Sequence, residues 1–380
     1  MDMQASPNPE WHKAKPLNLV RDKKMLLARV AGKQIALFDT ESGIKACDNR
    51  CPHEGYPLSE GSLSGECTLT CNWHNWKFNL ESGENFYGGD RLRIYPVEVR
   101  GDDVWVDIAE PPYDIRYSAI TKNLRDAFDD HSYDRIAREI ARLIQLGADP
   151  FEALRLCIDW SWQRMEFGWT HAYAGMADWL QLYNETDDRE IKLACLLESV
   201  AHAAFDVLRE PVYAFSDDRI DYEESVFLNA IENEDEATAC ASIRGAIAAG
   251  LGFEDLEEAL STAALAHYND FGHSLIYVSK VGYLIEQLGT SVAEPLLLSL
   301  VRGIVFASRE DRIPEFRDYA PTLDQWGQPS VGSSDQLPSA KDWRGAGISK
   351  SLTTTLACSN AKPADIYREL LLSNAINMLS

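Results

Sequence analysis

Hydrophobic and polar residues alternate in short runs along the first hundred residues of the chain, a pattern typical of β-strands with one buried face. The expected strands are Met25–Val30, Gln34–Asp39, Gly43–Cys47, Trp76–Asn79, Ile94–Val99 and Val104–Ile108. Turn residues such as Ser82 and Gly83 separate the runs. The pattern predicts an all-β domain over residues 1–112, built as a small antiparallel barrel or sandwich.

From Tyr113 onward the period of the apolar residues changes to that of a helix. Ile136, Ile140 and Leu143 form one such apolar stripe. Gly147 is placed to end that helix, and Asp149 is placed to cap the next one. We expect about eight helices between residues 117 and 309, in a mainly α-helical domain over residues 113–380 that forms a bundle or an array.

The helical region resembles itself when it is shifted by 102 residues. The shift places Phe151–Leu154 on Phe253–Leu256 and the segment ending at His171 on the segment ending at His273. We therefore predict an internal duplication, with repeats over residues 132–209 and 235–309 and with the two histidines in equivalent places.

The end of the chain loses the helical period. Residues 315–360 gather serine, glycine and proline, which predicts a surface loop or lid. An amphipathic pattern returns over residues 364–377 and predicts a terminal helix.

Charge and hydropathy narrow the function classes. Acidic residues outnumber basic ones 60 to 36, for a formal net charge of −24, so nucleic acids and anionic membranes would be repelled and neither is an expected partner. The longest apolar run, Leu296–Ser308, contains Arg302 and is too short to cross a bilayer. Met1–Lys15 is polar and lacks the pattern of a secretory signal, so we expect a cytoplasmic protein.

Two cysteine and histidine pairs stand out in the β domain. Cys51 and His53 form a C-x-H motif, and Cys71 and His74 form a C-x-x-H motif seventeen residues later. Cysteine and histidine each occupy only 8 of the 380 positions, so chance is a poor explanation of this order. The spacing predicts two loops that point four metal ligands at one place.

A tetrahedral zinc ion is one candidate occupant of a site with two cysteines and two histidines. Zinc modules usually place their ligand pairs on a knuckle or a helix with other spacings, whereas strands and turns surround these pairs. The neighbouring Cys47 and Cys67 are expected to be small buried core residues rather than further ligands.

The surroundings of the two motifs narrow the choice. They include the turn Gly55–Leu58, Gly61 and the aromatic run Trp73–Phe78. With these features, residues 10–110 resemble the Rieske [2Fe–2S] family, and the resemblance does not extend into the helical region.

The resemblance implies a ligand set for a [2Fe–2S] cluster. Cys51 and Cys71 would bind one iron as thiolates, and His53 and His74 would bind the other as neutral imidazoles. Replacing two thiolates by imidazoles removes negative charge and raises the potential to roughly −150 to +300 mV, from about −400 mV for plant-type clusters.

Two positions place the chain within that family. The respiratory type carries an extra disulfide-bonded cysteine in each loop, where this chain has Tyr56 and Asn72, so it is similar to the soluble ferredoxin and oxygenase type. The second loop commonly reads C-P-W-H-G-W, and here Asn72 replaces the proline and Asn75 the glycine. Asparagine tolerates left-handed backbone better than other non-glycine residues, so we expect the turn to be kept.

The resemblance implies a Rieske-type oxidoreductase. We expect electrons to come from an external ferredoxin or flavin reductase, because the chain has no dinucleotide fingerprint and no P-loop. They would pass through the cluster to a site in the helical domain that acts on a small-molecule substrate.

The acceptor site is not defined by a motif. The mononuclear-iron motif D-x-x-H-x4-H of Rieske oxygenases is absent. His171, His267 and His273 are the candidates for a catalytic site with an additional iron, and their helical neighbours place His171 and His267 toward the interior. Hydrogen-bonded core histidines are the competing interpretation.

Two other functions stay open. The chain could be a non-catalytic electron-transfer or redox-responsive protein whose acidic helical domain docks a partner. It could also be a non-redox enzyme with a regulatory or structural cluster.

Overall fold

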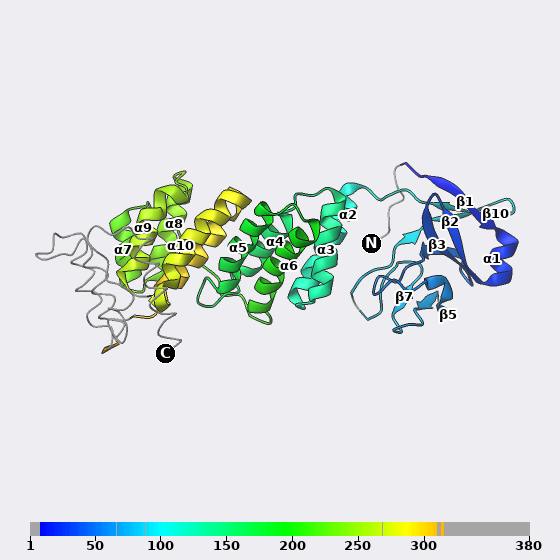
Figure 1. Ribbon diagram of the computed structural model, residues 1–380, viewed down its shortest axis with the longest axis horizontal. Coiled ribbons are helices and arrows are strands. Elements are labelled where there is room, and N and C mark those ends of the chain that lie inside the picture. The colour runs from blue at the N-terminus through cyan, green and yellow to red at the C-terminus, as the bar shows by residue number, and fades with distance from the viewer. Residues whose placement is uncertain (1–7, 66, 88, 268, 310–312, 315–380) are drawn as a thin grey trace, which may run out of the picture. The chain divides into compact units, whose positions relative to one another are not determined.

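The computed structural model describes residues 8–65, 67–87, 89–267, 269–309 and 313–314 (Figure 1). The chain divides into two compact units, one of residues 1–153 with 188–204 and one of residues 154–187 with 205–380. The loop or lid predicted over residues 315–360 and the helix predicted over residues 364–377 lie outside the described residues.

The first unit begins with an all-β domain, drawn in blue and cyan in Figure 1. Its strands are β1 (Trp11–Pro16), β2 (Met25–Val30), β3 (Lys33–Thr40), β4 (Gly43–Asp48), β5 (Ser62–Ser64), β6 (Thr68–Thr70), β7 (Lys77–Asn79), β8 (Ile94–Tyr95), β9 (Val97–Arg100) and β10 (Asp103–Asp107). They form three antiparallel sheets in the orders β1-β10-β9, β2-β3-β4-β8 and β5-β6-β7. Two short helices, α1 (Leu17–Lys23) and the 3₁₀-helix η1 (Leu58–Glu60), complete the domain.

Strand β3 separates two hydrophobic cores. Ile35 and Leu37 pack into one core, while Ala36 and Phe38 pack into the other. All four side chains are fully buried, because successive residues of a strand point to opposite faces and both faces of β3 are covered. Cys47 lies opposite Ala36 on β4 and joins the second core.

The helices of the first unit are α2 (Tyr113–Asp129), α3 (Tyr133–Leu146) and α6 (Arg189–Asp206, whose last two residues belong to the second unit). The predicted stripe of α3 is buried at Ile136, Ile140 and Leu143. Gly147 ends α3 in the left-handed conformation at φ 84°, and its N–H group bonds to a carbonyl of the last turn. The predicted end of this helix is confirmed.

The helices of the second unit are α4 (Glu152–Ser161, whose first two residues belong to the first unit), α5 (His171–Glu185), α7 (Glu224–Glu232), α8 (Glu236–Ala248), α9 (Phe253–Ala266), α10 (Asn269–Leu288), the 3₁₀-helix η2 (Thr290–Val292) and α11 (Ala293–Val305). Within the described residues, ten α-helices and no strand follow the β domain. This confirms the prediction that the chain after the β domain is mainly helical. The expected number of about eight was too low. His131 and Glu234 lie between successive helices in the left-handed conformation, with φ values of 48° and 58°. No glycine or proline marks these two helix ends in the sequence.

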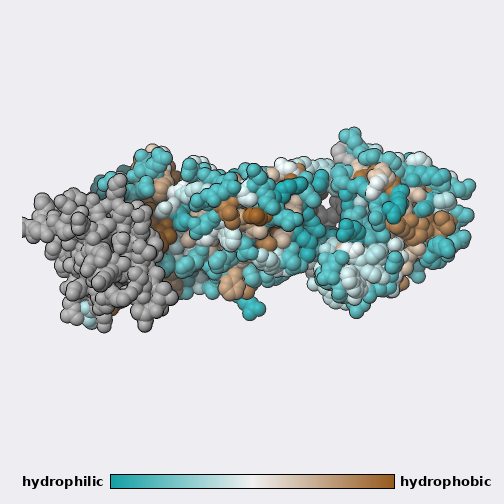
Figure 2. Space-filling view, viewed as in Figure 1, coloured by the Kyte–Doolittle hydropathy of each residue, from teal (hydrophilic) through white to brown (hydrophobic). Residues whose placement is uncertain are grey.

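The part of the surface that Figure 2 colours is mostly polar. On the face seen in Figure 2, hydrophilic residues cover most of the part that is not grey, with smaller hydrophobic patches between them. Over the described residues, no helix combines the length and the apolar character needed to cross a bilayer.

Candidate metal centre

The first ligand loop runs from Cys51 to Tyr56 as a closed turn. The N–H group of Cys51 donates to the carbonyl of Tyr56 at 2.8 Å, and the N–H group of Gly55 donates back to the carbonyl of Cys51 at 2.8 Å. Gly55 adopts φ 81°, which a glycine does without strain. The loop therefore holds the backbone around the Cys51 thiol in one conformation.

The second ligand loop repeats this hydrogen-bond pattern. The N–H group of Cys71 donates to the carbonyl of Trp76 at 2.8 Å, and the N–H group of Asn75 donates to the carbonyl of Cys71 at 2.9 Å. Asn75 adopts φ 59°, so it takes the left-handed position that Gly55 holds in the first loop. The expectation that asparagine keeps this turn is confirmed.

Asn72, the other departure from the common motif, ties the second loop to its neighbour. Its amide nitrogen donates to the carbonyl of Glu60 at 2.9 Å, and its carbonyl oxygen accepts a bond from the Ser62 hydroxyl at 2.7 Å. A proline at this position could make neither bond. The substitution replaces a stiff residue by side-chain hydrogen bonds.

The four predicted ligands lie on these two loops as a buried pair and an outer pair. Cys51 and Cys71 are buried, with 3% and 1% of their surface exposed, and they belong to the same hydrophobic core. His53 and His74 lie nearer the surface, with their Nδ1 atoms 3.2 Å apart and their rings at 83°. Soft sulfur donors inside and imidazole nitrogens outside fit a cluster with one sulfur-bound and one nitrogen-bound iron.

Aromatic side chains orient both imidazoles. His53 stacks on Trp76 with ring centroids 4.5 Å apart, and His74 stacks on Trp73 at 4.9 Å. Glu54 was not among the predicted site residues, and its carboxylate lies 3.9 Å from Nε2 of His74 and close to both histidines. A carboxylate near the outer nitrogen of a ligand histidine favours one tautomer and ring orientation. Its position next to His53 in the sequence was the available signal.

Burial shapes the chemistry of the cysteines. It is the largest cause that raises the pKa of the Cys51 thiol to about 11, and the nearby Cys71 adds to it. A bound metal cation offsets this cost, because it stabilises the thiolate. Cys47 and Cys67 are buried in the neighbouring core, as expected. Cys67 lies in a turn at φ 58°, however, and not in a strand.

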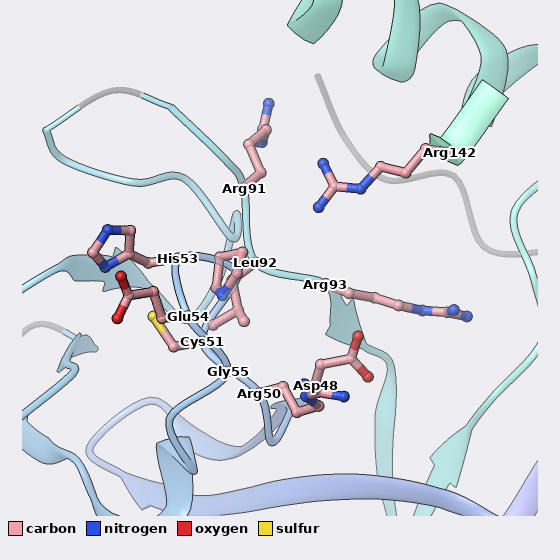
Figure 3. A pocket seen from close by; sticks show the side chains of 11 residues that line it. Asp48, Arg50, Cys51, His53, Glu54, Gly55, Arg91, Leu92, Arg93 and Arg142 are labelled. Carbon is pink, nitrogen blue, oxygen red and sulfur yellow. The ribbon is translucent and has the colours of Figure 1, made fainter. Parts of the chain in front are cut away.

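A pocket of about 530 Å³ lies beside the first ligand loop. Figure 3 shows Cys51, His53 and Glu54 on one side of it and Arg142 reaching in from α3. Its lining holds four arginines, namely Arg50, Arg91, Arg93 and Arg142. The same lining holds the carboxylates of Asp48 and Glu54, and Arg93 forms an ion pair with Glu110, so acidic groups offset much of this positive charge.

Arg142 is also part of a buried charge network within the first unit. It donates to the Asp90 carboxylate at 3.0 Å and bonds to Glu139 one turn away on α3. Arg138 contacts the same Asp90 carboxylate at 2.8 Å. Because Asp90 is fully buried, these ion pairs fix the loop that follows β7 onto α3.

The structure separates the three histidines predicted for the helical region. His171 and His273 lie together in the second unit, with their Nε2 atoms 3.2 Å apart. His267 instead contacts Glu232 through its Nε2 atom at 2.8 Å, and it joins no group of three ligand residues among the described positions. The expectation that His171 faces the interior is wrong: α5 begins at His171, so Phe167 is not its neighbour on a helix, and the histidine is exposed.

Comparisons with known proteins support the family resemblance of the β domain. The family model of the Rieske [2Fe–2S] domain matches residues 10–91. The 3-phenylpropionate/cinnamic acid dioxygenase ferredoxin subunit of Shigella boydii is 36% identical over 78 residues, which are 20% of this chain and 74% of the subunit. The 4beta-methylsterol monooxygenase of Methylococcus capsulatus is 29% identical over 113 residues, which cover 27% of this chain and only 30% of that enzyme.

Among solved structures, the ferredoxin of carbazole 1,9a-dioxygenase from Nocardioides aromaticivorans is 20% identical, with a TM-score of 0.24, and covers 26% of this chain and 97% of the ferredoxin. The family model lies within the β domain. Through its N-terminal β domain the chain belongs to the Rieske [2Fe–2S] family, and this domain binds a [2Fe–2S] cluster.

Proposed function

We propose that Cys51 and Cys71 hold one iron of the cluster as thiolates and that His53 and His74 hold the other through Nδ1. The observation that carries this proposal is the 3.2 Å approach of the two Nδ1 atoms, on the same two loops that bury one thiol each. When bound, such a cluster supplies one-electron transfer. The stacked tryptophans keep the imidazoles at the surface, where an electron has the shortest path to a partner.

We further propose that the chain is an oxidoreductase of the cytoplasm. Electrons enter from an external ferredoxin or flavin reductase at the two histidines and leave for a site in the helical domain, residues 113–380. A small-molecule substrate reacts at that site. Support comes from two relatives, a ferredoxin subunit of a dioxygenase and a monooxygenase.

Spectroscopy of the purified, anaerobically reconstituted chain tests the ligand set. Reduction should give the rhombic paramagnetic signal of a Rieske cluster, with an average g near 1.9. Cys71→Ala and His74→Ala should abolish it, while Cys47→Ala, a buried cysteine outside the proposed set, should keep it. Colourless protein that binds only zinc would show that the ligand set serves a different metal.

A second function is a non-catalytic electron carrier or redox-responsive protein whose helical domain docks a partner. The net charge of −24 and the ferredoxin relative favour it, because a strongly acidic surface recruits a basic protein. Electron transfer to a separate oxidase without turnover of any small molecule would support this function over the first.

The predicted duplication stays a proposal, with one structural observation in its support. Helices α5 and α10 pack against each other within the second unit, as Figure 1 shows in green and yellow. Asp178 pairs with Lys280 across this contact, and Asn184 donates to Gln287 at 2.9 Å. These pairs are 102 and 103 residues apart, so the two helices run parallel in the register that the sequence shift predicts.

A further inference from the structure

We propose that His171 and His273 bind one first-row divalent metal ion through their Nε2 atoms, and that its other coordination positions stay open to water or substrate. The site itself stands on the geometry of the second unit. Its role as the electron acceptor, for which iron is the suitable metal, rests on the proposed function.

The distance between the two nitrogens suits a shared ion. A metal about 2.05 Å from each nitrogen holds two of them roughly 3.3 Å apart at a tetrahedral angle and roughly 2.9 Å apart at a right angle. The Nε2 atoms of His171 and His273 are 3.2 Å apart, between these two values. Both nitrogens can therefore reach one ion without moving the helices.

The proposed cluster ligands give an internal reference for this geometry. His53 and His74 have a nitrogen separation of 3.2 Å, ring centroids 4.7 Å apart and a ring angle of 83°. His171 and His273 have the same separation, centroids 4.9 Å apart and an angle of 80°. The second pair presents Nε2 instead of Nδ1, so its ion would lie beyond the tips of the rings.

The two histidines lie on two helices that pack against each other. His171 is the first residue of α5, whose N-terminus is capped by Thr170, and His273 lies in the second turn of α10. The ring of Tyr277 packs near both imidazoles, with centroids 6.1 Å and 5.8 Å away. The ion pair of Asp178 with Lys280 holds the same two helices together further along. Such support lowers the entropic cost of bringing two ligands to one metal.

The donor set decides which metals fit. Among the described residues, His53, Glu54 and His74 are the only group of three histidine, cysteine or carboxylate side chains close enough to share an ion. The site of His171 and His273 offers two imidazoles to one ion. Imidazole suits iron, nickel, copper and zinc, and affinity should rise from Fe²⁺ through Ni²⁺ to Cu²⁺ and fall again at Zn²⁺.

Metal titration of the cluster-loaded full chain tests the site, with Ni²⁺ and Zn²⁺ as probes. We expect one ion per chain, and at least a tenfold loss of affinity in His171→Ala and in His273→Ala. His202→Ala, at an exposed histidine of α6, is the matched control and should bind like the parent. Equal affinity and stoichiometry in all variants would overturn the proposal, because the pair would then be joined by a hydrogen bond alone.

Two further measurements cover the case in which an alanine variant folds poorly. His273→Gln keeps a hydrogen-bonding side chain and should still lose the ion. In the parent protein, Cu²⁺ should show hyperfine coupling to two imidazole nitrogens, and coupling to one or none would contradict the geometry. Iron bound at the site and oxidised to Fe³⁺ should be reduced to Fe²⁺ by one electron from the reduced cluster. If iron binds but the reduced cluster does not reduce it, the metal site stands and the proposed function fails.

Discussion

Asn75 gives the sharpest test of how the second ligand loop is held. Its φ of 59° is left-handed, a conformation that costs an ordinary L-residue about 1–2 kcal/mol and that asparagine adopts more readily. We expect Asn75→Gly to stay within about 0.5 kcal/mol of the parent. Asn75→Ala should lose about 1 kcal/mol and Asn75→Val about 2 kcal/mol, because a β-branched side chain clashes most with this backbone.

The assay is thermal unfolding of the full chain, followed by the visible absorbance of the cluster. In a domain of this size, 1 kcal/mol corresponds to a shift of roughly 4–8 °C in the midpoint. Gly55 supplies the comparison, because it holds the equivalent position at φ 81°. Gly55→Asn should cost more than Asn75→Gly, since its Cβ would lie 3.0 Å from the Arg50 guanidinium. Equal midpoints for the glycine, alanine and valine variants of Asn75 would refute the reasoning, since backbone strain would then play no part.

Three other perturbations follow from single contacts. Gly168→Ala should destabilise the protein by about 3 kcal/mol in urea unfolding, because its Cβ would lie 2.3 Å from the carbonyl oxygen of Ser299. Gly250→Ala is the control and should cost about 1 kcal/mol, because Gly250 is also left-handed but has open space around it. Burial raises the pKa of Glu139 to about 7, so stability should fall by up to about 3 kcal/mol as the pH rises from about 4.5 to above 7; Glu139→Gln should flatten that profile. His53→Cys should lower the reduction potential by more than about 100 mV in an EPR-monitored titration, because a thiolate adds negative charge.

The sequence predicted the β domain well, and it singled out the two proposed ligand loops, because both rest on short-range patterns. The apolar run of β3 lies within one strand, and each ligand pair lies within four residues of chain. Cysteine and histidine are rare and chemically specific, so two closely spaced pairs carry much information. The left-handed turn at Asn75 was likewise predictable, because few residues adopt it.

Other features depend on contacts that the sequence does not display. His171 seemed buried because a helical neighbour pattern was extended past the start of α5. The breaks at His131 and Glu234 use left-handed non-glycine residues, so they carried no turn signal. Glu54 gained its place near His74 only through the approach of two loops. The first of these errors was a misplaced helix boundary, whereas the others concern backbone conformations and loop contacts that local propensity does not encode.

The register of α5 and α10 links the proposed duplication to the proposed metal site. In a stack of repeated helical units, equivalent helices of neighbouring units lie side by side and parallel. A single surface histidine on the ancestral unit would then meet its own copy after duplication, as His171 meets His273 at 3.2 Å. Two ligands would arise from one by duplication alone. Later substitutions near the two histidines could then change the affinity for the metal, because the parallel packing of the two helices already sets the separation of the imidazoles.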